Sequence, residues 1–98
     1  MQQVFVAVWR FESGKRPKQD DKEAMVEWAD EQRDAGLLSA WGWAASPICN
    51  RAMAVLTVPH MAEAVELVLH CPITRLSQPD LFEWIDAAVA ADTRGQDL

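Results

Sequence analysis

Hydrophobic residues follow one another almost without a polar break in the first predicted strand, 4–11. They are mostly β-branched or aromatic, which favours a strand that is buried on both of its faces. Alternation divides the apolar side chains into two sets on opposite faces: Val4, Val6 and Val8 on one, and Phe5, Ala7 and Trp9 on the other.

Apolar residues then recur at helical spacing from Lys22 to Ala35. The stripe on one side of this predicted helix consists of Met25, Trp28, Ala29, Gln32 and Ala35. The other side is strongly acidic. Asp20 or Asp21 is expected to cap the N-terminus, and Gly36 stands where a left-handed residue ends a helix.

Strand and helix patterns alternate over the rest of the chain, separated by turn residues. The predicted elements are a strand at 37–45, a turn at 46–50, a strand at 51–58, a helix from 61 to about 71, a strand at 81–87 and a frayed tail at 88–98. Together with the first strand and helix, they form one domain over residues 1–98.

The order of elements, βαββαβ, predicts a ferredoxin-like α+β fold: a four-stranded antiparallel sheet with two helices on one face. The third strand, like the first, is apolar on both faces, with Met53 and Val55 opposite Ala54 and Leu56. A sheet with one wet face would alternate apolar and polar residues. We therefore expect a second copy of the chain to cover the other face.

Two segments carry a resemblance to a known family: residues 31–37, EQRDAGL, and residues 64–73, AVELVLHCPI. They are similar to the ends of the two helices in the dimeric α+β barrel superfamily, within it the muconolactone isomerase-like group. The resemblance implies a homodimer acting on small organic acids, lactones or polyketide-like rings. Isomerases, cyclases, decarboxylases and cofactor-free oxygenases occur in this superfamily. No catalytic residue is carried over from it.

The net charge of -6 argues against a nucleic-acid partner, which would need clustered Lys and Arg. The one basic cluster, Lys15, Arg16 and Lys18, is followed at once by two aspartates. It indicates a solvated loop or, as the alternative, a loop that binds a ligand.

Neither a basic leader with a cleavage site nor a membrane-length apolar run is present, so we expect a cytoplasmic protein without a membrane partner. Cys49 and Cys71 are too few for a disulfide scaffold and are expected to be reduced. The two cysteines and two histidines lack metal-ligand spacing, so neither a metal nor another cofactor is expected.

The predicted topology gathers tryptophan and arginine residues at one edge of the sheet, a setting that suits a planar anionic ligand. The predicted substrate-binding residues are Trp9, Arg10, Trp41, Trp43 and Arg75. Trp41 and Trp43 share a face; we favour the helix side, where they would line a pocket, over the partner's sheet. The alternative for the arginines is that they pair with the surplus acids.

His60 and His70 are the candidate catalytic residues, as proton shuttles. Each also has a purely structural interpretation. His60 stands at the cap position of the second helix. His70 lies near the C-terminus of that helix, four residues after Glu66, where the dipole and an i,i+4 pair favour it.

The leading functional hypothesis is an enzyme that carries out cofactor-independent proton transfer, as an isomerase or cyclase, on a small anionic, aromatic or lactone-type compound. The alternatives are a ligand-binding barrel without turnover, a dimerisation module, and a cofactor-free monooxygenase. A cavity with a histidine or carboxylate beside an arginine would favour the enzyme. A cavity lined by tryptophan with only backbone polar groups would favour the ligand-binding barrel, and a closed interface without a cavity would favour the dimerisation module.

Overall fold

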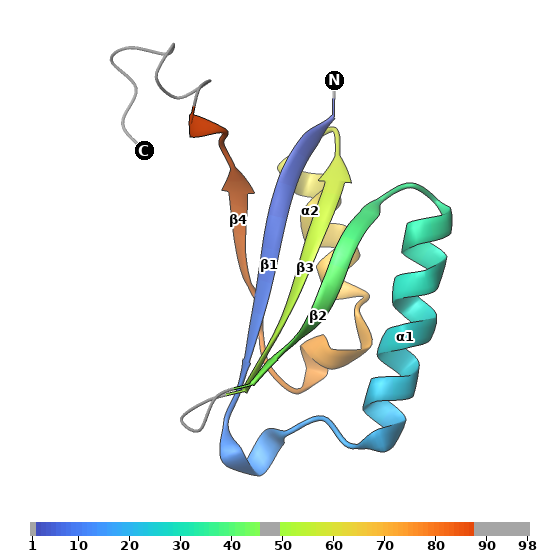
Figure 1. Ribbon diagram of the computed structural model, residues 1–98, viewed down its shortest axis with the longest axis vertical. Coiled ribbons are helices and arrows are strands. Elements are labelled where there is room, and N and C mark those ends of the chain that lie inside the picture. The colour runs from blue at the N-terminus through green and yellow to red at the C-terminus, as the bar shows by residue number, and fades with distance from the viewer. Residues whose placement is uncertain (1, 46–49, 88–98) are drawn as a thin grey trace.

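A computed structural model describes residues 2–45 and 50–87 of the chain (Figure 1). Its strands and helices are β1 (Gln3–Phe11), α1 (Gln19–Asp34), β2 (Leu38–Ala45), β3 (Asn50–Val58), α2 (Met61–Leu69) and β4 (Asp80–Trp84). Two short 3₁₀ turns, η1 (Ser13–Lys15) and η2 (Pro72–Arg75), follow β1 and α2. The predicted turn at 46–49, which includes Cys49, and the tail at 88–98 lie outside the described residues.

The four strands form one antiparallel sheet in the order β2-β3-β1-β4. β1 is a central strand and pairs with β3 along its whole length and with β4 over half of it. Both helices lie on the same side of the sheet (Figure 1). The predicted α+β ferredoxin-like fold is therefore confirmed. Within the described ranges, no helix is long and apolar enough to cross a membrane.

The core lies between the sheet and the helices. Phe5, Ala7 and Trp9 of β1 are fully buried on this face, as the alternation predicts. The neighbouring strand and the two helices complete the core with Ala52, Ala54, Leu56, Val58, Met25, Trp28, Ala29, Ala64 and Val68. Ala7, Ala52 and Ala54 keep the middle of this sheet face shallow, which leaves room for the large rings of Trp9 and Trp28.

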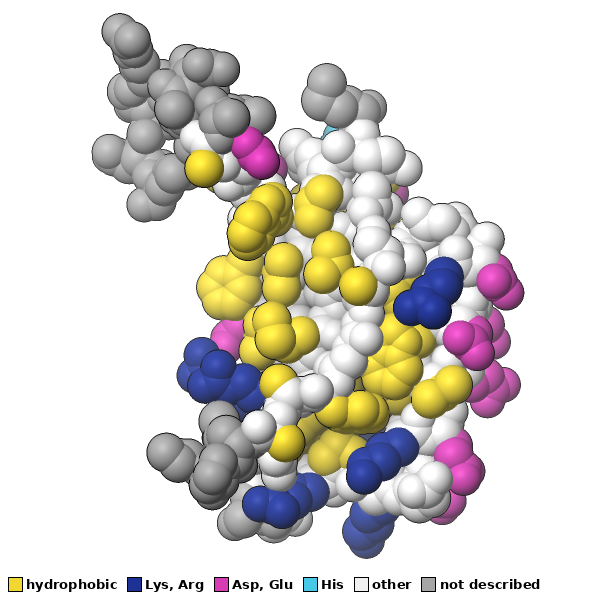
Figure 2. Space-filling model, viewed as in Figure 1, with side chains coloured by type: hydrophobic (Ala, Val, Ile, Leu, Met, Phe, Trp, Pro, Cys, Tyr) yellow, Lys and Arg dark blue, Asp and Glu magenta, His cyan; other side chains and the backbone are white. Residues whose placement is uncertain are grey.

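The opposite face of the sheet, here called the open face, is also apolar. Figure 2 shows hydrophobic side chains gathered over β4 and β1, with charged side chains mainly at the margins. The open face carries Val4, Val6, Val8, Met53, Val55, Phe82 and Trp84, whose partners across the strands lie in register. Phe82 and Trp84 are 54% and 64% exposed. The predicted two-sided apolar sheet is confirmed, and none of the helices in the described part of the chain covers the open face.

Element ends differ from the prediction where local chemistry decides them. Helix α1 begins at Gln19, three residues early, with Lys18 rather than an aspartate at the N-cap. Asp21 instead accepts a hydrogen bond from the Lys18 backbone N–H at 2.8 Å. Helix α2 ends at Leu69, because Pro72 disfavours helical backbone at the preceding residue, and Cys71 is extended. β4 is shorter than predicted and ends at Trp84.

The end of α1 at Gly36 follows the prediction. Gly36 has φ +78°, the left-handed region, and its N–H donates to the Arg33 carbonyl at 3.0 Å. The N–H of Leu37 donates to the Gln32 carbonyl at 2.9 Å, which completes a Schellman motif. This cap turns the chain from α1 directly into β2.

Replacing Gly36 by Ala should lower the free energy of unfolding by about 1–2 kcal/mol, the cost of left-handed backbone for a residue with a Cβ. No heavy atom lies within 4 Å of the position of that Cβ, so the loss measures backbone strain alone. Gly14→Ala, which has the same open surroundings without a positive φ, is the control. If urea unfolding gave the same loss of unfolding free energy for both variants, the loss at Gly36 could not come from its left-handed backbone.

Candidate functional site

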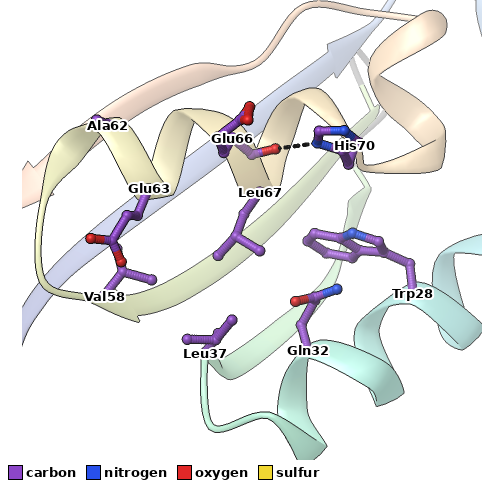
Figure 3. A pocket seen from close by; sticks show the side chains of 9 residues that line it. All are labelled: Trp28, Gln32, Leu37, Val58, Ala62, Glu63, Glu66, Leu67 and His70. Atoms are coloured by element: carbon purple, nitrogen blue, oxygen red, sulfur yellow. Dashed lines mark hydrogen bonds between the residues drawn. The ribbon is translucent and has the colours of Figure 1, made fainter.

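A groove of about 580 Å³ lies between α1 and α2 on the helix side of the sheet (Figure 3). Its apolar walls come from Leu37, Val58 and Leu67, together with the ring of Trp28. Its polar groups are few: Gln32 of α1, Glu63 and Glu66 of α2, and His70 directly after α2. An apolar cleft with a few convergent polar groups is the usual form of a small-molecule site.

Trp28 is the most unusual lining residue. Its side chain is buried, and its indole Nε1–H finds no hydrogen-bond acceptor among the described residues. Leaving a buried donor unsatisfied costs about 1–3 kcal/mol, so such groups usually have a partner. In Figure 3 the ring of Trp28 extends from α1 into the space below His70. A ligand oxygen in the groove would supply the missing acceptor.

His70 has a fixed tautomer when its ring is neutral. Its Nδ1 lies 2.8 Å from the backbone carbonyl oxygen of Glu66 (Figure 3). A carbonyl oxygen only accepts, so Nδ1 carries the proton and donates. Nε2 therefore carries the lone pair, which is the arrangement that a general base requires. The carboxylate of Glu66 points away from the groove in Figure 3, so the backbone of Glu66 alone orients the ring.

His60, the other candidate proton shuttle, lies at the opposite end of α2. It occupies the N-cap position, is exposed, and makes no capping hydrogen bond through its side chain. At 1.5 Å per residue, the nine residues of α2 separate the two histidines by about 13 Å or more. The structure therefore does not bring His60 and His70 together.

The two predicted arginines both have acidic partners. Arg75 forms an ion pair and a hydrogen bond with the buried carboxylate of Asp21, and Arg10 Nε lies 3.7 Å from Asp80 Oδ2. Both arginines also border a polar cavity of about 480 Å³ at the end of β1, together with Lys15. The topology thus gathers them at one edge, but their charges are already partly neutralised.

Trp9 is a core residue. It is fully buried, so it offers no surface to a ligand. Its indole N–H donates to Thr74 Oγ1 at 3.0 Å, and the Thr74 hydroxyl donates to the Val68 carbonyl at 2.5 Å. This chain of hydrogen bonds joins β1 to η2 and to the last turn of α2, and so holds the segment that carries His70.

Trp41 and Trp43 lie on the helix side of the sheet, because they pair in register with Ala54 and Ala52, whose side chains are buried there. Their rings meet edge-on, with centroids 5.7 Å apart at 80°. Trp41 packs against the core, whereas Trp43 stays exposed. Neither ring lines the groove between the helices.

Sequence reasoning did not predict that Trp28 and Gln32 line a groove. Both stand on the apolar stripe of α1, which predicted them only as core. Gln32 was the available signal, because a polar residue on an apolar stripe needs a partner or a cavity. What the pattern did not reveal is that this part of the stripe faces a groove.

Cys71 is a poor nucleophile despite its position next to His70. It is buried, and its thiol donates to Met25 Sδ at 3.4 Å. Burial raises the pKa of Cys71 from 9.0 to about 11, against smaller opposing effects of hydrogen bonds from Ile73 and Thr74. The thiolate is therefore scarce at neutral pH, and a Cys–His pair is not supported.

The raised pKa of Cys71 makes folding stability depend on alkaline pH. The folded state favours the thiol, so this stability is complete below pH 9 and falls as pH rises toward about 11. The unfolding free energy should drop by about 1.4 kcal/mol for each pH unit in that window. We expect Cys71→Ala, compared with wild type in a Cys49→Ser background, to remove this part of the pH dependence in urea unfolding. If the unfolding free energy fell equally steeply with alkaline pH with and without Cys71, the pH dependence could not come from this thiol.

Comparison with protein-family models finds no family that matches the chain, and no curated protein matches it either. Over residues 2–45 and 50–87, no three His, Cys, Asp or Glu side chains gather closely enough to hold a metal ion.

Proposed function

We propose that the protein catalyses cofactor-independent proton transfer next to a carbonyl group, as an isomerase or cyclase of small ring compounds. The observation that carries the proposal is the pairing, in one apolar groove, of an unsatisfied buried donor with a histidine of fixed tautomer. Trp28 Nε1–H supplies the donor, and Nε2 of His70 supplies the base.

The chemistry follows from these two groups. Nε2 of His70 takes a proton from the carbon next to the carbonyl, and the C–H electron pair moves onto the carbonyl oxygen as an enolate. Trp28 and the amide of Gln32 donate hydrogen bonds to that oxygen, where negative charge develops. In a substrate with a C=C bond next to the carbon that loses the proton, the product is a dienolate. The imidazolium then gives its proton to the far carbon of the dienolate, the electron pair on oxygen re-forms the C=O bond and the C=C bond moves, which completes an isomerisation without a cofactor.

The groove favours an uncharged substrate over an anionic one. Among the described residues its lining contains no Lys or Arg, and the carboxylate at its border belongs to Glu63, since that of Glu66 points away (Figure 3). An anion would meet the Glu63 carboxylate there in a site of low polarity, without a cation to offset it, which is unfavourable. We therefore narrow the substrate class to neutral aromatic or lactone-type rings. A monooxygenase has no particular support from the groove.

The probe for this activity is 2-indanone, a planar neutral ketone with exchangeable protons next to its carbonyl. The protein should accelerate their exchange for deuterium in D₂O, followed by proton NMR. His70→Gln should lower the catalysed rate to about one hundredth or less, because a positioned general base contributes about 10²–10⁴-fold.

His60→Gln is the matched control, because it changes the exposed histidine at the other end of α2. Trp28→Phe should also lower the rate, since it keeps an aromatic ring and removes the donor. Equal losses for His60→Gln and His70→Gln would contradict the proposal. Binding of 2-indanone without faster exchange would favour the ligand-binding barrel instead.

We also propose that a second copy of the chain covers the open face, which places the protein in the dimeric α+β barrel superfamily. The open face is broad, apolar and exposed on a chain of 98 residues, which supports this proposal. The buried free thiol of Cys71 fits the reducing cytoplasm, where we place the protein.

The dimer should depend on β4. Phe82→Lys places a charge on the open face, at a side chain that is 54% exposed in the single chain, so it should separate the copies with little effect on the fold. Leu69→Lys makes the same change at a residue of α2 that is 59% exposed, and should leave the dimer intact. Light scattering should give twice the chain mass of 11.0 kDa for wild type and Leu69→Lys, and the chain mass for Phe82→Lys. The chain mass for wild type at micromolar concentration would defeat the proposal.

A further inference from the structure

We propose a second ligand site, for a small planar anion of the aromatic carboxylate class, where β2 and β3 meet the start of α1. A cavity of about 320 Å³ lies there, and it shares no lining residue with the groove between the helices. The residues that carry the argument are Phe11, Arg16, Lys22, Trp43 and Arg51. We call this cavity the basic pocket.

The basic pocket concentrates positive charge on an acidic protein. Among the residues that the structure describes, its lining includes three cationic side chains and no Asp or Glu, although the chain has fifteen acids and only nine bases. The ion pairs formed among the described residues are Arg10–Asp80 and Arg75–Asp21. Arg16, Lys22 and Arg51 belong to neither of them. An anion would relieve the repulsion that gathering these charges creates.

Arg51 gives the most specific indication. Its Nε is buried, and within the described part of the chain no acceptor bonds to it. In the sheet Arg51 also pairs directly with Arg10, a like-charge pair that is unfavourable unless each cation has a counter-charge. Arg10 has Asp80. A carboxylate bound in the basic pocket would give Arg51 both its missing acceptor and its counter-charge.

Trp43 and Phe11 make the pocket suitable for a flat ring. Trp43 is exposed although two aromatic neighbours hold it: Trp41 edge-on at 5.7 Å and Phe11 at 6.4 Å with a 48° tilt. An exposed ring in a fixed position provides a surface for stacking. Positive charge beside an aromatic surface selects a planar anion over a neutral ring or a cation. The ligand class therefore differs from the neutral one proposed for the groove.

The test uses benzoate as the probe and proton–nitrogen NMR of the full chain as the readout. Benzoate should shift the indole N–H signal of Trp43, assigned through Trp43→Phe, and the Nε–H signal of Arg51. Benzamide, its neutral isostere, should produce little shift at the same concentration. Inorganic phosphate should compete for the cations without reproducing the Trp43 shift.

Arg51→Gln should weaken benzoate binding about tenfold, because a charge-assisted hydrogen bond and a counter-charge are both lost. Lys22→Gln, at an exposed position of α1, is a second variant that should weaken binding while the fold is kept. Arg33→Gln makes the same charge change at an exposed residue outside the pocket and should bind as wild type does. Equal shifts with benzoate and benzamide, or equal losses for Arg51→Gln and Arg33→Gln, would overturn the proposal.

Discussion

The structure depends on one constraint: β1 is central in the sheet and apolar on both faces, while the helices of residues 2–45 and 50–87 cover only one of them. Phe5, Ala7 and Trp9 are sealed under α1 and α2. Val4, Val6 and Val8 face the other way, and each is in register with at least one apolar residue of β3 or β4. Removing apolar surface from water is the main favourable term in folding and association, so the second face calls for a cover of its own.

The groove forms because the two helices pack on different strands of the sheet. α1 packs against β2 and η2, whereas α2 packs against β3 and β1, so the two helices rest on different parts of the sheet. Apolar residues line the space between the helices, and His70 lies at its border. The hydrogen bonds from Trp9 to Thr74 and from Thr74 to the last turn of α2 fix the position of the segment that carries His70. The core thus positions the one histidine with a defined lone pair.

The sequence allowed the fold and the two faces of the sheet to be predicted because strand periodicity is a local property. Gly36 was predictable for the same reason, since only glycine readily takes its backbone conformation. The helix ends were less predictable. The carboxylate of Asp21, within the first turn of α1, accepts a hydrogen bond from the Lys18 N–H, so the helix begins without an aspartate at the N-cap. Pro72 disfavours helical backbone at Cys71, the residue before it, so α2 ends early. The partners of Arg10 and Arg75 and the groove beside Trp28 depend on packing between distant elements, which periodicity does not encode.

Two methionines offer the most direct test of the central claim that the open face is covered while the helix side stays accessible. Met53 on the open face and Met61 at the start of α2 are both 41% exposed in the single chain. Oxidation to the sulfoxide, followed by mass spectrometry, reports their access to solvent. The account predicts that Met53 is oxidised severalfold more slowly than Met61 in the wild type, and that Phe82→Lys removes the difference. Equal oxidation rates in the wild type at every protein concentration would contradict it.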